Sequence, residues 1–252
     1  MGFVMAGWKF SAKAALKSPA TLWSASTASR CASLVGVALI ALAGRAAAQG
    51  TVSGQVTILE KAGEATSDFG STVVWVEPAS GSRSRPAPAM KAQIAMDGRK
   101  FVPRLRVITS GSTVDFPNQD PFNHNIFSNA DGGQFDLGLY GRGEGKSAVF
   151  AKAGAYPIYC NIHSRMTGYI IVVPTMLFAQ GEGDGKWAIE KVPPGRYVLH
   201  VWHERAAEVT RDLSVSGAGA SGIAVQLDAK GFKVLAHKNK FGQDYKDGGV
   251  RY

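Results

Sequence analysis

Three side chains that bind soft metals lie close together in the segment Cys160–Met166. A thiol, an imidazole and a thioether follow one another at intervals of three residues, in Cys160-Asn-Ile-His163-Ser-Arg-Met166. Copper prefers these donors, and a cysteine with two histidines in a plane and a distant methionine is the ligand set of a blue-copper electron-transfer site. The segment supplies three of these four ligands, so one more histidine is required.

His124 is the candidate for the remaining ligand. It lies 36 residues before Cys160, in Phe116-Pro-Asn-Gln-Asp-Pro-Phe-Asn-His124-Asn-Ile-Phe-Ser128. Because it follows a predicted strand and a proline-containing turn, we expect it on a loop at one end of a β-sandwich. Zinc is the rival metal, but structural zinc sites use several thiolates or imidazoles and rarely a thioether.

Residues 1–48 have the pattern of a secretory signal peptide. Lysines and arginines, with no acidic residue, precede an apolar run that starts at Cys31, and Arg45-Ala-Ala-Ala48 offers small residues for cleavage. The apolar run is too short to span a bilayer comfortably, and no second long apolar stretch follows it. The sequence therefore predicts a soluble periplasmic or secreted protein, with no stable membrane insertion after cleavage.

Cleavage changes the cysteine count and the charge. The whole chain has two cysteines and a formal charge of +9, and residues 1–48 hold Cys31 and five of the basic residues, so the mature chain keeps one thiol and a charge of +4. This small excess does not argue for a nucleic-acid partner. An unpaired cysteine in an exported protein needs an explanation. A buried inert thiol is one explanation, but the neighbouring His163 and Met166 favour metal ligation for Cys160.

Short alternating segments separated by Gly, Pro and Asn run along the mature chain, and helical periodicity is scarce. This pattern is typical of an all-β protein. The expected strands are Thr51–Ile58, Thr72–Glu77, Ala92–Met96, Leu105–Val107, Val114–Phe116, Phe135–Leu139, Ser147–Phe150, Ala155–Cys160, Gly168–Val173, Trp187–Ile189, Tyr197–Val201, Leu213–Val215 and Ile223–Leu227. Seven of them fall between residues 88 and 174, which suits one small sandwich or barrel.

The remaining strands predict a second, discontinuous domain. Two strands before the linker at Pro78–Pro88 cannot bury a core alone, but they can form one sandwich with the four strands that follow residue 174. We therefore expect residues 51–80 and 175–228 to form one domain, with residues 88–174 inserted into it. Three consecutive pieces are the simpler alternative. Residues 229–252 are rich in Lys, Arg, Asp and Gly and are expected to form a basic, flexible tail.

Several of these segments carry a family resemblance. Phe116-Pro-Asn, His124-Asn-Ile-Phe-Ser128, Phe135-Asp-Leu-Gly138 and Tyr159-Cys-Asn-Ile-His163 resemble the cupredoxin domain of periplasmic proteins often labelled methylamine-utilisation proteins, and the Cys-x2-His-x2-Met spacing is similar to that of amicyanin. Gly50-Thr-Val-Ser-Gly54 and Val192-Pro-Pro-Gly-Arg-Tyr197 resemble the carboxypeptidase regulatory-like sandwich, which is transthyretin-like or Ig-like. The resemblance implies a Greek-key cupredoxin sandwich inserted in, or joined to, this second sandwich.

The resemblance also implies roles for particular residues. His124, Cys160 and His163 would be the equatorial ligands of one mononuclear type 1 copper, and Met166 would be the weak axial ligand. Asn125 matches the family position whose side chain ties the two ligand loops together. Phe122, Phe127 and Ile162 are candidates for an apolar collar around the site, since they are close to the ligands in sequence.

Three functions are compatible with this site. The first is an electron carrier, not an enzyme, that serves a periplasmic redox protein such as a cytochrome or a dehydrogenase. A copper enzyme is less compatible, because the chain has five histidines and no His-x-His pair, and because an axial methionine leaves no open coordination position. A copper-handling or partner-recognition module is the third. His200 and His203 lie three apart on a predicted strand, so they face opposite sides, and we expect both at the surface.

Overall fold

The computed structural model describes residues 49–62, 64, 66, 68–80, 86–233 and 236–245. The expected signal peptide, residues 1–48, lies outside them. The described residues form seventeen strands and one short 3-10 helix at Phe69–Ser71, with no α-helix, so the all-β prediction is confirmed. No helix among them has the length and apolar character needed to cross a membrane.

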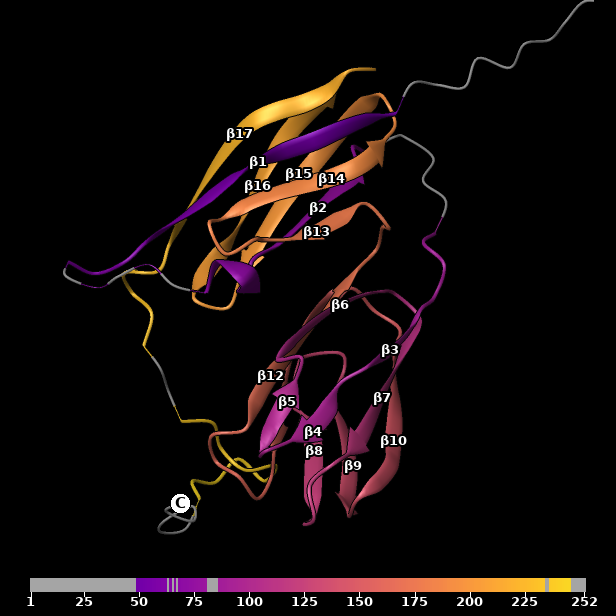
Figure 1. Ribbon diagram of the computed structural model, residues 1–252, viewed down its shortest axis with the longest axis vertical. Helices are drawn as coiled ribbons and strands as arrows, with labels where there is room; N and C mark the ends of the chain where they lie inside the picture. The colour runs from indigo at the N-terminus through magenta and orange to yellow at the C-terminus, as the bar shows by residue number, and fades with distance from the viewer. Residues whose placement is uncertain are drawn as a thin grey trace, which may run out of the picture. The chain divides into compact units, whose positions relative to one another are not determined.

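Strands from the two ends of the described chain share two sheets (Figure 1). One sheet has the order β14-β1-β17, from Lys186–Val192, Gly50–Leu59 and Gly219–Asp228. The other has the order β13-β2-β15-β16, from Phe178–Gln180, Val73–Pro78, Gly195–His203 and Ala206–Val215. Inward-facing side chains of both sheets form one apolar cluster that includes Val56, Leu199 and Val225. The kinship of this sandwich with carboxypeptidase regulatory-like domains stays a prediction.

The middle of the chain forms two further five-stranded sheets around a separate apolar cluster. One contains β10-β7-β4-β5, with β3 paired to β7, and the other has the order β6-β12-β11-β8-β9. The strands are β3 Lys91–Gln93, β4 Ala95–Asp97, β5 Lys100–Val102, β6 Leu105–Thr109, β7 Ser112–Asn118, β8 His124–Ser128, β9 Phe135–Tyr140, β10 Gly143–Phe150, β11 Gly154–Cys160 and β12 Thr167–Val173.

Three differences separate these ten strands from the seven expected. The segment expected as one strand, Ala92–Met96, is broken at Ile94 into β3 and β4. β5 has only three residues, too few to show a period. β8 begins at His124, which therefore lies on a strand and not on the loop that the sequence predicted. All five residues of β8 are buried, so the polar and apolar alternation that marks a half-buried strand is missing from it.

A tight turn joins β4 to β5 and holds the side chain of Asp120. Gly98 and Arg99 at its centre have φ values of 60° and 59°, which is the geometry of a type I′ hairpin turn. Glycine adopts this left-handed conformation without cost, whereas a residue with a Cβ atom does so rarely. The turn points the N–H groups of both residues toward Asp120.

Candidate metal centre

The segment Cys160–Met166 is the connection between β11 and β12. Cys160 is the last residue of β11 and Thr167 is the first of β12. The Cys160 N–H donates to the Met166 carbonyl at 3.1 Å, and the Met166 N–H donates to the His163 carbonyl at 3.0 Å. The hairpin and these two bonds fix the backbone on which the thiol, the imidazole and the thioether are carried.

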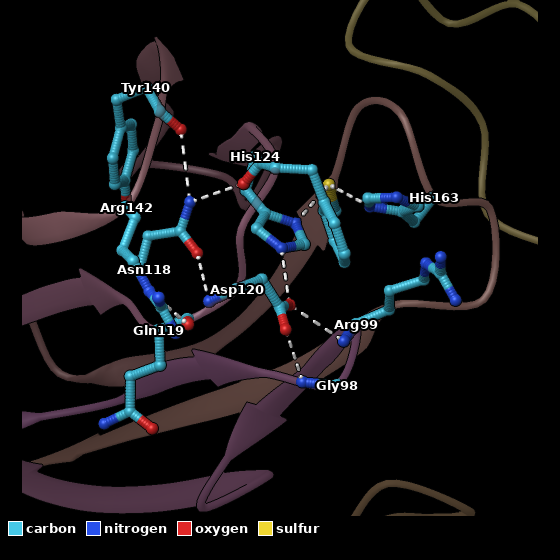
Figure 2. A network of polar contacts seen from close by, with 11 residues as sticks. Gly98, Arg99, Asn118, Gln119, Asp120, His124, Tyr140, Arg142 and His163 are labelled. Carbon is cyan, nitrogen blue, oxygen red and sulfur yellow. Dashed lines mark hydrogen bonds and ion pairs between the residues drawn. The ribbon is translucent and has the colours of Figure 1, made fainter.

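The fold brings His124 to the same place. Its Nδ1 lies 3.6 Å from Cys160 Sγ, and His163 Nδ1 lies 3.4 Å from that sulfur. The three ligand atoms are all within 4.8 Å of one another, and they form the one group of three or more His, Cys, Asp or Glu in the described residues that could hold a metal ion. His124 and Cys160 are buried, whereas His163 is partly exposed. Figure 2 shows both imidazoles beside the sulfur atom.

These distances fit a single bound ion. Metal–sulfur bonds of about 2.3 Å and metal–nitrogen bonds of about 2.0 Å, set about 110–120° apart, separate sulfur from nitrogen by about 3.5–3.8 Å. The observed separations of 3.6 and 3.4 Å lie at or near this range. One thiolate and two imidazoles are also donors that copper accepts. The three residues therefore fit a copper ion without a change of backbone.

The protonation of the ligands suits a cation. Burial is the largest effect on Cys160 and raises the pKa of its thiol, while N–H groups of Asn125, Ile162 and His163 partly offset it. A metal ion would supply the charge that holds the thiolate in this buried position. Burial also lowers the pKa values of His124 and His163. Both imidazoles are therefore neutral near pH 7, as ligation requires.

Met166 is fully buried in the same apolar cluster as Cys160. Its backbone closes the loop through the bonds to Cys160 and His163. The thioether therefore lies in the apolar interior of this sandwich, and its role as the axial ligand stays a prediction.

Asn125 connects the two ligand segments through its backbone. Its carbonyl accepts the Asn161 N–H at 2.9 Å, and its own N–H donates toward the Cys160 sulfur. The side chain, to which the family resemblance gave this role, donates to Asp136 Oδ1 at 2.5 Å. Asp136 lies on β9, which pairs with β8, so the neighbouring strand takes the amide group.

The apolar residues expected around the site have different positions. Phe122 packs against both imidazoles, with ring centroids 5.3 Å from His124 and 5.7 Å from His163. Ile162 is 40% exposed and lies on the ligand loop. Phe127 is buried and packs against Tyr159. Phe122 and Ile162 thus fit the idea of a collar, and Phe127 is a core residue.

The prediction that His200 and His203 both lie at the surface is wrong for His203. His200 is partly exposed and pairs with Glu208 at 2.7 Å. His203 is 1% exposed, and its Nε2 lies 3.2 Å from the Asp68 carbonyl. The reason is the strand period of two: Tyr197, Leu199, Val201 and His203 all face the core.

Asp120 is a site residue that the sequence analysis missed. Its Oδ2 lies 2.8 Å from His124 Nε2, on the ring edge opposite to the sulfur. An aspartate four residues before a histidine in an irregular turn is a weak signal. The turn residues Gly98 and Arg99, which hold the carboxylate, are more than twenty positions away in sequence.

A C-terminal strap, the described residues 236–245, also contacts the ligand loop. Tyr245 donates from its hydroxyl to the Cys160 carbonyl at 2.7 Å, and the Lys240 N–H donates to Asn161 Oδ1 at 2.9 Å. The ring of His237 stacks on Tyr159 at 4.6 Å between centroids. The sequence placed these residues in a solvated tail, because their composition is polar and rich in glycine.

Part of this chain is similar in sequence to known proteins. A segment of 84 residues is 39% identical to chloroplastic plastocyanin from Chlamydomonas reinhardtii, covering 29% of this chain and 58% of that protein. The chain thus spans little more than half the length of this curated relative. Among solved structures, a purple cupredoxin from Nitrosopumilus maritimus is 29% identical over 32% of this chain and 99% of that chain, with a TM-score of 0.30. An oxidised amicyanin variant is 20% identical over 32% of this chain and 80% of that chain, with a TM-score of 0.31.

The plastocyanin match supports a cupredoxin domain in this chain. No protein-family model matches the chain. The TM-scores are low, so the function of the site is inferred from its own residues.

Proposed function

We propose that this chain is an exported type 1 copper protein that transfers single electrons in the periplasm. One mononuclear copper ion would be held by His124, Cys160 and His163, with Met166 as a weaker fourth ligand. The observation that carries this proposal is the geometry of three potential ligand atoms: Nδ1 of His163 and Nδ1 of His124 lie 3.4 and 3.6 Å from the Cys160 sulfur.

The surroundings of these ligands favour electron transfer over catalysis. Hydrogen bonds from both ligand segments restrain Cys160, and His124 is fully buried. A restrained ligand set changes little when a bound copper ion changes oxidation state, which favours fast electron exchange. Substrate turnover would need an open coordination position, and a fourth ligand from Met166 would fill it. When bound, copper supplies a one-electron redox couple.

His163 is the expected point of exit for the electron. It is the partly exposed ligand among the three, and its ring contacts Phe122. Ile162 beside it is 40% exposed. An apolar surface around a partly exposed ligand would allow a redox partner to approach closely while water is displaced. The expected partner is a periplasmic redox protein such as a cytochrome or a dehydrogenase.

A test should separate an electron carrier from a copper-handling module. Copper-loaded protein purified from the periplasm is mixed, in its reduced form, with oxidised cytochrome c, and in a parallel sample with a strong Cu(I) chelator. A carrier reduces the cytochrome rapidly and keeps its copper. Rapid loss of Cu(I) to the chelator without cytochrome reduction would replace the proposal with a copper-handling function.

A further inference from the structure

The carboxylate of Asp120 and the imidazole of His124 form a buried pair. Oδ2 and Nε2 are 2.8 Å apart, and the two side chains are 7% and 0% exposed. His124 presents its opposite nitrogen, Nδ1, to Cys160. The imidazole therefore stands between the Asp120 carboxylate and the proposed copper position, and Figure 2 shows its contact with Asp120.

Backbone groups hold this carboxylate in place. Gly98 N–H donates to Oδ1 at 2.8 Å and Arg99 N–H donates to Oδ2 at 3.0 Å. Asn118 Oδ1 accepts the Asp120 N–H at 2.9 Å, and the same amide group donates to the Phe122 carbonyl at 2.8 Å. Two separate segments thus fix the position of Asp120, and it cannot turn away from His124 without breaking several bonds.

The hydrogen bonds to the carboxylate assign the proton between it and His124. Oδ1 accepts the Gly98 N–H and Oδ2 accepts the Arg99 N–H, as a carboxylate that only accepts would do. The proton between the two groups therefore belongs to Nε2 of His124. Nδ1 then has a free lone pair directed toward the sulfur.

We propose that Asp120 is a positioning residue that fixes the tautomer of His124 and lowers the reduction potential of the bound copper. This inference rests on the proposed function. A carboxylate that accepts the distal N–H of a histidine ligand makes that ligand more basic. A more basic ligand and a nearby negative charge both stabilise Cu(II) more than Cu(I), because Cu(II) carries the higher charge.

The rival explanation is that Asp120 only braces the turn between β4 and β5. Removal of the carboxylate would then loosen the turn and leave the potential unchanged. Asp120→Asn keeps the shape and an oxygen for His124, but it loses the charge and places an NH2 group against the Gly98 N–H. The variant therefore disturbs the turn as well, and the reduction potential is the measurement that separates the two roles. Asp97→Asn is the matched control, since Asp97 is an exposed carboxylate directly before the same turn.

The first test uses the unaltered, copper-free protein and does not depend on electron transfer. Nitrogen-15 NMR of the histidine rings reports which nitrogen carries the proton. We expect Nε2 of His124 to be protonated and Nδ1 to be bare near neutral pH. A proton on Nδ1 would overturn the assignment of the tautomer to Asp120.

The second test is redox titration of copper-loaded wild type, Asp120→Asn and Asp97→Asn. We expect a higher reduction potential for Asp120→Asn alone, with the visible copper band retained in all three proteins. Equal potentials in Asp120→Asn and Asp97→Asn would overturn the inference. If Asp120→Asn does not fold, Asp120→Ser replaces it, because serine removes the same charge with a smaller side chain. Absence of the copper band from wild type would contradict the proposed function instead, and the NMR result would still decide the tautomer.

Discussion

The two β-sandwiches use their interiors differently. Nine polar or charged side chains are buried among the described residues, and seven of them lie between Thr109 and Ser128 in the middle sandwich. The other sandwich is filled by an apolar cluster. A buried polar group costs free energy unless it is hydrogen bonded. Thr109 and Ser112 lie at the turn between β6 and β7, whereas hydrogen bonds connect Asn118, Asp120 and His124 beside the proposed ligands. Buried polar groups therefore gather around the candidate metal centre, and the core of the other sandwich is mainly apolar.

Two histidine–carboxylate pairs sharpen the same contrast. His200 and Glu208 lie 2.7 Å apart with side chains 18% and 39% exposed, while His124 and Asp120 lie 2.8 Å apart with 0% and 7% exposed. Exposed pairs contribute little because water screens them. The buried pair lies beside a thiol, where its charge acts on the proposed metal. Similar geometry thus has different consequences in the two sandwiches.

The largest expected effect comes from the sulfur ligand. Cys160→Ser replaces the thiolate with a hydroxyl, which is a poor donor for copper, so the thiolate-to-copper absorption band should disappear completely. Visible spectroscopy of copper-loaded protein measures this. Ser164→Ala, in the same loop, is the control and should keep the band. A variant at Cys160 with the full band would show that another group binds the metal.

A core substitution in the other sandwich should have the opposite effect: it should lower the stability of the protein and leave the copper band unchanged. Leu199 is 1% exposed in the apolar cluster, and Leu199→Ala should lower the free energy of unfolding by about 2–5 kcal/mol through lost contacts and a cavity. Urea denaturation measures the loss. The folded variant should keep the copper band unchanged, because the site lies in a separate apolar cluster. A weakened band would show that the two sandwiches are coupled more tightly than their cores suggest.

The buried His203 should make the other sandwich sensitive to acid. Burial lowers its pKa in the folded protein, whereas a histidine in the unfolded chain titrates near about 6.5. The unfolded state therefore binds more protons below that pH. The stabilisation that comes from keeping His203 neutral is therefore complete above about pH 6.5. Below that pH, the free energy of unfolding falls by at most about 1.4 kcal/mol per pH unit. Urea denaturation between pH 5 and 7.5 should show a smaller slope for His203→Gln than for wild type, and equal slopes would contradict this role.

Met166 is a buried core residue and also the proposed axial ligand, so a substitution at this position tests both roles. Met166→Leu conserves volume, so the free energy of unfolding should change by less than about 1.5 kcal/mol. Leucine offers no lone pair to Cu(II), so the reduction potential should rise while the visible band persists. Redox titration and denaturation together measure both effects. An unchanged potential would leave Met166 as a core residue only.

The smallest effect is expected at the C-terminal strap. Tyr245→Phe removes the hydroxyl that donates to the Cys160 carbonyl and should cost about 0.5–1.5 kcal/mol. The copper band should stay unchanged, because the bond is to the backbone and not to the sulfur. Denaturation and visible spectroscopy test both statements, and a shifted band would mean that the strap influences the ligand itself.

The sequence was most informative where the chemistry is local. Cys160, His163 and Met166 lie within one loop, and His124 stood out because it follows a predicted strand and a proline-containing turn. The all-β class followed from alternation along the chain. β8 was missed because all of its residues are buried, which removes the alternation.

Contacts between distant segments could not be found in this way. Asp120 depends on a turn at Gly98 and Arg99 that only the folded sheet brings near. The strap residues Lys240 and Tyr245 contact a loop about eighty positions earlier. The polar, glycine-rich composition of this segment does not predict that contact. His203 is a different case, since continuing the period of two from Leu199 and Val201 would have placed it inside.

The most direct test of the central claim is the visible spectrum of the copper-loaded protein, combined with a metal count. The account predicts one copper per chain and an intense thiolate-to-copper absorption band that is bleached on reduction and restored on oxidation. A colourless Cu(II) protein, or a protein that binds zinc in preference to copper and shows no such band, would contradict it.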